Sequence, residues 1–311
     1  MKYKKARIIQ AAISLAIVGL TCNIAVLLLN ANRPLSASIS QPTMPQPSQV
    51  NLTVAPVTAL SYKIETYDSQ VMGGSRTYGV SLPPGYEQNP TKHYPVIFLL
   101  HGGHGYPTDW FDNQKGRALV TLKNLYDEGK LPPSIIITPD GNDKRGSSPY
   151  WDPQYIDGKN GKVSTAIGED LVSLIKSRYR TLPTPNFWAI GGYSSGGWGA
   201  MNVGLHHRNN FSILFSHSGY FRDKSGPQNS PLNYIRTISQ ADRIKLYIYL
   251  DIGQSDNEDL PENREFHTLL NRLKVANVFN EFPGAHTWSY WREHLADSLT
   301  FVGEQFKQAQ S

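Results

Sequence analysis

The chain is short of cysteine, and no acidic residue precedes Glu65. Cys22 is the only cysteine among 311 residues, so no intrachain disulfide can form. Removing the five cations of residues 1–33 from the 30 basic residues leaves 25, which equals the 25 acidic residues; the five are Lys2, Lys4, Lys5, Arg7 and Arg33. The net charge of +5 therefore belongs to the N-terminal end. The neutral remainder gives no electrostatic case for nucleic-acid binding.

An apolar run without charge follows the first four cations. It covers 22 residues, 8–29 (IIQAAISLAIVGLTCNIAVLLL). A cationic start before an apolar stretch is typical of a signal peptide or a signal anchor, and a bilayer span needs about 20 residues. We therefore expect residues 1–30 to anchor the chain in a membrane, with the body extracytoplasmic. Cleavage near residues 35–37, which would release a secreted protein, stays open as the alternative; lipid attachment at Cys22 is disfavoured because the run continues past it.

A linker and one large domain are expected after this segment. Residues 31–57 are rich in Pro, Ser, Gln and Asn, as in extended linkers. Residues 58–311 carry the features of a single folded domain, and no internal repeat is present. We predict that this domain is the catalytic one.

The fold class follows from short apolar runs that alternate with helical stretches. Residues 61–67 and 76–82 alternate like antiparallel strands. Six later runs read as strands buried on both faces: 96–100, 135–138, 187–190, 213–216, 246–250 and 278–282. Helices are expected at 117–129, 166–179, 197–208, 262–276 and 288–307. This order predicts an α/β three-layer sandwich with a mostly parallel central sheet and antiparallel N-terminal strands. Ligands bind such sheets at the carboxyl ends of the strands.

A G-x-S-x-G motif follows the third of these six strands. Gly192 and Gly196 lie two residues before and after Ser194. In a strand–turn–helix context this spacing marks a strained turn, because a Cβ at either flanking position would clash. We predict that Ser194 is the nucleophile and that Ser195 supplies a backbone N–H to an oxyanion. The competing interpretation is a glycine-rich turn with bystander serines.

A serine nucleophile needs a base and an acid, which α/β-hydrolases carry in the chain order Ser, acid, His. Asp256 and His286 each follow a predicted strand in that order. Asp251 lies closer to its strand and is the weaker candidate. Glu258 and Asp259 are interpreted as solvated surface acids.

Two further loops follow predicted strands. The run HGGHG, residues 101–105, is typical of the loop that donates the second oxyanion N–H, and Gly103 is the predicted donor. His101 and His104 lack an evident third ligand, so no metal or cofactor is expected. In the loop 141–161, Tyr150, Trp151 and Tyr155 are candidates for stacking on a sugar or a phenolic acyl group. Packing of the loop is the alternative.

Together these motifs resemble one family. The segments PPGY, YPVIFLLHGGHG, PDGN, AIGGYSSGGWGAM, SHSGYF, LDIGQSD and GAHTWSYWREHL occur in the order found in esterase D-like α/β hydrolases. The resemblance covers about residues 60–308 and implies a catalytic triad of Ser194, Asp256 and His286, with oxyanion donors at Gly103 and Ser195.

The same resemblance implies a serine esterase acting on a small-molecule or carbohydrate ester, such as an acetyl or feruloyl ester. Two alternatives remain. One is an acyltransferase of the mycolyltransferase type, which passes the acyl group to a sugar hydroxyl. The other is a non-catalytic membrane-tethered binding protein on the same fold.

Overall fold

The computed structural model describes residues 59–310. The predicted anchor and linker lie outside these residues, so they remain predictions. Among the helices of residues 59–310, none is long and apolar enough to span a bilayer.

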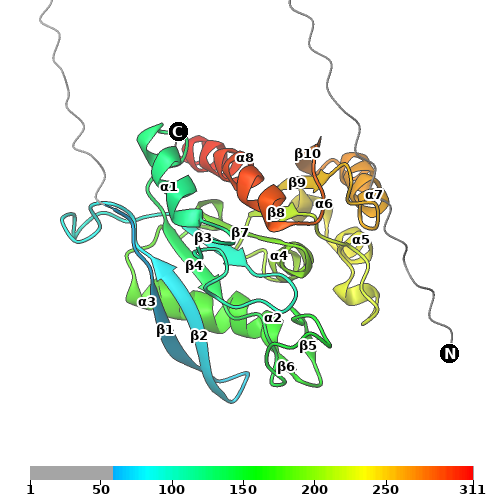
Figure 1. Ribbon diagram of the computed structural model, residues 1–311, viewed down its shortest axis with the longest axis horizontal. Coiled ribbons are helices and arrows are strands. Elements are labelled where there is room, and N and C mark those ends of the chain that lie inside the picture. The colour runs from blue at the N-terminus through cyan, green and yellow to red at the C-terminus, as the bar shows by residue number, and fades with distance from the viewer. Residues whose placement is uncertain (1–58, 311) are drawn as a thin grey trace, which may run out of the picture. The chain divides into compact units, whose positions relative to one another are not determined.

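A single eight-stranded sheet forms the centre of the fold (Figure 1). Its strand order is β1-β2-β4-β3-β7-β8-β9-β10. The β1–β2 and β2–β4 pairs are antiparallel, and all other neighbours are parallel. The bounds are β1 Lys63–Ser69, β2 Gly74–Ser81, β3 Val96–Leu100, β4 Ile135–Pro139, β7 Trp188–Tyr193, β8 Ile213–His217, β9 Tyr247–Gly253 and β10 Ala276–Phe282. The predicted strands and their mixed pairing are confirmed.

Helices cover both faces of the sheet because successive strand residues point to opposite sides. In β3, Val96, Phe98 and Leu100 belong to the core under α3, α4 and α7, whereas Ile97 and Leu99 belong to the core under α1 and α8. The bounds are α1 Ala118–Asp127, α3 Val172–Arg178, α4 Ser195–His206, α7 Leu260–Arg272 and α8 Trp288–Gln308. The three-layer sandwich predicted from the continuous apolar runs is therefore confirmed.

One predicted helix is interrupted. The spacing predicts one helix over 166–179, but a π-helical segment, Ala166–Leu171, separates α2, Val163–Thr165, from α3. At Gly168 a Cβ would lie 2.2 Å from the His207 ring, and the Asn210 side chain donates to the Gly168 carbonyl over 2.9 Å. Side chains of a neighbouring segment thus pack into this turn, which apolar spacing does not reveal.

Several short elements were not predicted because they are too brief to show a period. They are β5 Asp157–Gly158, β6 Gly161–Lys162, α5 Pro231–Tyr234, α6 Gln240–Arg243 and the 3-10 turns Pro185–Phe187, Pro227–Asn229 and Ile235–Thr237.

A buried hydrogen-bonded set joins β8, β9 and α8. Asp251 Oδ2 lies 2.8 Å from His217 Nδ1, and Ser298 Oγ lies 3.0 Å from His217 Nε2. The Tyr290 hydroxyl donates to Asp251 Oδ1 over 3.1 Å. Asp251, His217 and Ser298 are each 0% exposed, so this Ser–His–Asp set is closed to any substrate. It is structural, and it accounts for Asp251 without a role in the reaction.

We expect Asp251→Ala to destabilise the protein. The change removes the acceptor of His217 Nδ1 and of the Tyr290 hydroxyl, and leaving these two buried atoms unsatisfied costs about 1–3 kcal/mol each. The free energy of unfolding, measured by urea denaturation, should fall by about 3 kcal/mol or more. The exposed Glu258→Gln is the control and should change it by less than about 0.5 kcal/mol. An Asp251→Ala protein as stable as the control would contradict a structural role for this set.

Candidate active site

Ser194 occupies a strained turn between β7 and α4. Its backbone has φ 54° and ψ −126°, a conformation that residues with a Cβ rarely adopt. Its N–H donates to the His217 carbonyl over 2.9 Å. The side chain is half-buried at the carboxyl end of the sheet, so its hydroxyl remains accessible.

The two flanking glycines permit this turn by close backbone contact. A Cβ on Gly192 would lie 2.5 Å from the Gly196 carbonyl oxygen, and one on Gly196 would lie 2.4 Å from the His101 oxygen and 2.5 Å from the Leu100 oxygen. No side chain fits at such distances. The register that selects Ser194 rather than Ser195 therefore has the steric basis that the motif predicts.

Ser194, His286 and Asp256 form a continuous hydrogen-bonded line. The Ser194 Oγ lies 2.8 Å from His286 Nε2, and Asp256 Oδ2 lies 2.7 Å from His286 Nδ1. The three come from the loops after β7, β10 and β9. Asp256 is 4% exposed, whereas the His286 side chain is partly buried, with 37% of it exposed. The structure thus brings together the three residues that the sequence singled out.

Packing and a backbone contact fix the histidine loop. Trp291 places its ring edge-on to the His286 ring, 5.0 Å away at 89°. The Ser255 N–H donates to the Gly284 carbonyl over 2.8 Å, which joins the acid loop to the histidine loop. A histidine held in this way keeps Nε2 directed at Ser194 without ordering by a substrate.

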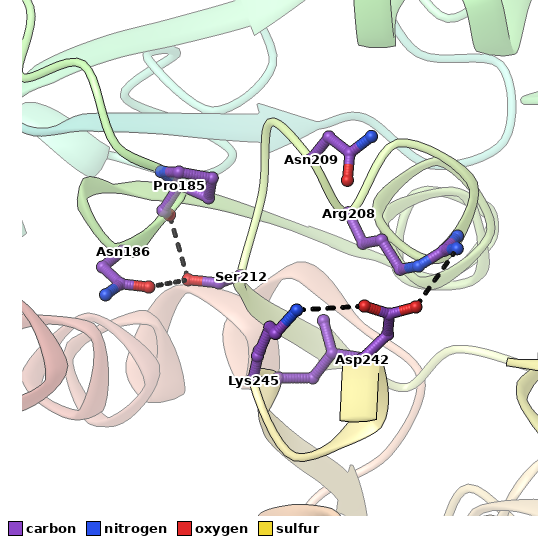
Figure 2. A pocket seen from close by; sticks show the side chains of 8 residues that line it. Pro185, Asn186, Arg208, Asn209, Ser212, Asp242 and Lys245 are labelled. Carbon is purple, nitrogen blue, oxygen red and sulfur yellow. Dashed lines mark hydrogen bonds and ion pairs between the residues drawn. The ribbon is translucent and has the colours of Figure 1, made fainter. Parts of the chain in front are cut away.

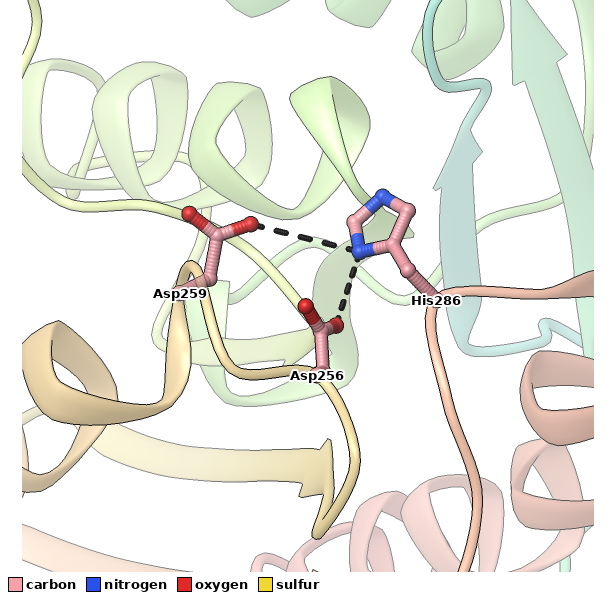
Figure 3. A group of neighbouring side chains, drawn as sticks. All are labelled: Asp256, Asp259 and His286. Carbon is pink, nitrogen blue, oxygen red and sulfur yellow. Dashed lines mark hydrogen bonds and ion pairs between the residues drawn. The ribbon is translucent and has the colours of Figure 1, made fainter. Parts of the chain in front are cut away.

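Asp259 is a second carboxylate near His286 (Figure 3). Its Oδ2 lies 3.9 Å from His286 Nδ1, and its side chain is 20% exposed. The interpretation of Asp259 as a solvated surface acid is therefore wrong. Burial and the nearby Asp256 charge raise the pKa of Asp259 to about 6. The sequence signal was only its place three residues after Asp256.

The charge state of His286 follows from these neighbours. Burial disfavours the charged ring, but the hydrogen bond to Asp256 and the charges of Asp256 and Asp259 outweigh burial. The pKa of His286 is therefore raised above its ordinary value. An imidazolium is stabilised here, as a base that accepts a proton from serine requires.

The two predicted oxyanion donors come from the first turn of α4 and from the loop after β3. Ser195 is the first residue of α4, where free N–H groups and the helix dipole favour negative charge. Gly103 lies in the loop after β3, and Asp152 Oδ1 lies 2.4 Å from the position that a Cβ on Gly103 would occupy. The tip of the loop 141–161 therefore lies against the glycine loop.

The three aromatic residues of that loop differ in position. Tyr155 is 0% exposed and donates its hydroxyl to the His101 carbonyl over 2.7 Å, so the prediction that it contacts substrate is wrong. Its ring packs against Gly141 and Gly199, an arrangement that sequence spacing cannot distinguish from exposure. Trp151 packs on Arg145, with 4.8 Å from the guanidinium to the ring centroid. Tyr150 is 88% exposed.

A hollow of about 360 Å³ lies away from the triad (Figure 2). Its lining residues precede β7, β8 and β9, at the opposite ends of the strands. Asp242 lies 3.7 Å from Arg208 and 3.1 Å from Lys245, so both cations of the lining are paired with this carboxylate. We assign it no role.

With this geometry in place, comparison with known proteins identifies the family. The model of the family described as "Putative esterase" matches residues 69–302. The chain belongs to this esterase family. The resemblance drawn from the motifs, and the class of enzyme that it implies, are confirmed at the level of the family.

Individual relatives of this esterase-family protein are distant. An uncharacterised protein of Corynebacterium glutamicum is 24% identical over 72% of this chain, which spans only 56% of that protein. An acetyl esterase of Caldicellulosiruptor saccharolyticus is 23% identical over 69% of this chain and 85% of its own length. A solved ferulic acid esterase is 28% identical, with a TM-score of 0.71 over 79% of this chain and 98% of that one.

We expect Gly196→Ala to disrupt the turn of this esterase-family protein. The new methyl group would overlap two backbone carbonyls that cannot move without shifting β3, and such overpacking costs about 1–3 kcal/mol. Thermal or urea unfolding should show the loss. The matched control is Gly74→Ala, because a Cβ there meets nothing within 4 Å. Equal stability of the two variants would contradict the steric account.

Proposed function

We propose that the protein is a serine esterase that hydrolyses carboxylic esters through an acyl-enzyme. The observation that carries this proposal is the unbroken line Ser194–His286–Asp256, with 2.8 Å and 2.7 Å between the bonded atoms. Its nucleophile has a strained backbone, and its acid is buried. Membership of an esterase family supports the same chemistry.

The reaction proceeds in two stages. Ser194 Oγ attacks the ester carbonyl carbon as His286 Nε2 takes its proton, and Asp256 stabilises the resulting imidazolium. The tetrahedral intermediate collapses when the carbon–oxygen bond of the ester breaks and His286 returns the proton to the leaving alcohol. Water, deprotonated by His286, then attacks the acyl-enzyme, which releases the acid and restores Ser194.

The oxyanion of each intermediate is proposed to accept hydrogen bonds from the N–H groups of Gly103 and Ser195. Both are backbone donors, so side-chain changes at Ser195 leave the donor in place. The absence of a side chain at Gly196 lets the turn after β7 approach the Leu100 and His101 carbonyls, which lead into the loop that carries Gly103.

The proposed substrates carry an uncharged acyl group, such as acetyl or feruloyl, on an alcohol or a carbohydrate. A solved ferulic acid esterase and an acetyl esterase among the relatives support this class. Asp152 beside Gly103 also supports it, because a carboxylate next to a proposed oxyanion donor repels an anionic acyl group. We place hydrolysis before acyl transfer to a sugar, because these two relatives and the family are described as esterases.

The location of this reaction is also a proposal. The cationic start and the apolar run of residues 8–29 support an extracytoplasmic enzyme that is tethered by its N-terminal segment or released by cleavage.

We expect Ser194→Ala to reduce the kcat for p-nitrophenyl acetate by at least about a thousandfold, since the nucleophile is lost. Ser195→Ala is the matched control and should retain activity within a few-fold, because only its backbone N–H is used. A fluorophosphonate probe should label the wild-type protein at Ser194 and fail to label Ser194→Ala. Full activity in Ser194→Ala would overturn the mechanism, and an unlabelled wild type would favour a binding protein.

We expect a preference for uncharged esters. Methyl ferulate and p-nitrophenyl acetate should be hydrolysed with a kcat/KM at least about tenfold above that of p-nitrophenyl hemisuccinate, after correction for intrinsic reactivity. Asp152→Asn should raise kcat/KM for the hemisuccinate several-fold and leave p-nitrophenyl acetate within about twofold. A hemisuccinate rate unaffected by Asp152→Asn and by ionic strength would contradict the electrostatic basis of this preference.

A further inference from the structure

Asp259 stands at the N-cap position of α7 but does not cap the helix. An aspartate at this position usually accepts a hydrogen bond from a backbone N–H of the first turn. Here the side chain makes no such bond, and the Asp259 backbone is held instead by Asn263, whose Nδ2 donates to the Asp259 carbonyl over 3.0 Å. Asn263 is fully buried and also donates to the Gly219 carbonyl over 2.7 Å. The carboxylate is thus positioned by a rigid backbone and is free for another partner.

That partner is the histidine of the triad. Asp259 Oδ2 and Asp256 Oδ2 lie 3.9 Å and 2.7 Å from the same atom, His286 Nδ1 (Figure 3). One carboxylate oxygen each of Asp256 and Asp259 and one ring nitrogen of His286 all lie within 4.8 Å of one another. Among the described residues, His286 is the one basic group within ion-pair distance of Asp259.

The other groups that face Asp259 do not neutralise it. Asp256 and Glu258 on its own loop add negative charge, as does Glu262 on α7. The charge of Asp259 also contributes to raising the pKa of the Tyr220 hydroxyl, which comes from the loop after β8. Arg222 lies 3.6 Å from Glu262 and is bonded to Glu265, so it is engaged on the helix.

We propose that Asp259 is a positioning residue that shares with Asp256 the task of orienting and stabilising the His286 imidazolium. The inference rests on the proposed function of the triad and adds a second acid to it. Asp256 makes the direct hydrogen bond. Asp259 supplies charge from the side of the ring that faces α7, and thereby sets the pH at which the base becomes available.

The direction of the effect follows from linkage. A carboxylate beside the imidazolium favours the protonated ring, so it raises the pH below which His286 is already protonated and inactive as a base. The pKa of Asp259 itself is raised to about 6, and because its carboxylate lies 3.9 Å from the ring, the titration of each group affects the other. Removing the carboxylate charge lowers the pKa of His286 and moves the acidic limb of the rate profile to lower pH.

The test is Asp259→Asn in the full-length protein, which keeps the shape of the side chain and removes its charge. The titration of His286, followed by NMR of its imidazole and assigned by its loss in His286→Gln, should move to lower pH by about half a unit to one unit. The acidic limb of kcat/KM for p-nitrophenyl acetate should move in the same direction. At the pH optimum, kcat should fall a few-fold with KM little changed, since Asp259 acts through the ring rather than on the substrate.

Glu258→Gln is the matched control, because it removes one negative charge from an exposed neighbour that solvent screens. It should move the His286 titration by less than half of the Asp259→Asn shift. An unchanged or higher pKa of His286 in Asp259→Asn would overturn the proposal. An equal shift of this pKa in Glu258→Gln would do the same. The NMR titration needs no turnover. A wild type that fails to cleave esters would therefore refute the proposed function, but the effect of Asp259 on the pKa of His286 could still be measured.

Discussion

The contact between Gly196 and the carbonyls of Leu100 and His101 is the constraint on which the site depends. It brings the turn after β7 within touching distance of the loop after β3. The same approach forces Ser194 into its unfavourable backbone conformation and sets Ser195 at the start of α4. This close approach therefore places the turn that carries Ser194 and Ser195 beside the start of the loop that carries Gly103.

The parallel order of β7, β8, β9 and β10 supplies those groups. Each strand delivers a loop to the same edge of the sheet, so residues separated by up to 92 positions meet within hydrogen-bond distance. The buried set around His217 lies directly beneath, since the His217 carbonyl accepts the Ser194 N–H and the Asp251 carbonyl accepts the Ser218 N–H. The turn that carries Ser194 is thus hydrogen-bonded to a layer of polar residues that solvent does not reach.

Much of this could be predicted from the sequence, because strands buried on both faces and a glycine pair around one serine leave few arrangements open. Other features depended on tertiary packing that no local pattern encodes. Tyr155 is buried because Gly141 and Gly199 leave space for its ring. Asp259 reaches His286 because Asn263 fixes its backbone, and His217 pairs with Asp251 across two adjacent strands. Spacing along the chain gives no measure of these approaches.

The buried Ser298–His217–Asp251 set has a consequence for how such enzymes are recognised. It has the same residue types, bonded in the same order and at nearly the same lengths as Ser194–His286–Asp256. Residue types and distances alone therefore do not tell the two sets apart. Three features separate them. Ser194 opens to solvent from a strained turn, whereas Ser298 is sealed within a regular helix and donates its hydroxyl to the Leu295 carbonyl over 3.1 Å. The two sets therefore share their residue types but differ in backbone strain, in access to solvent and in the partner of the serine hydroxyl.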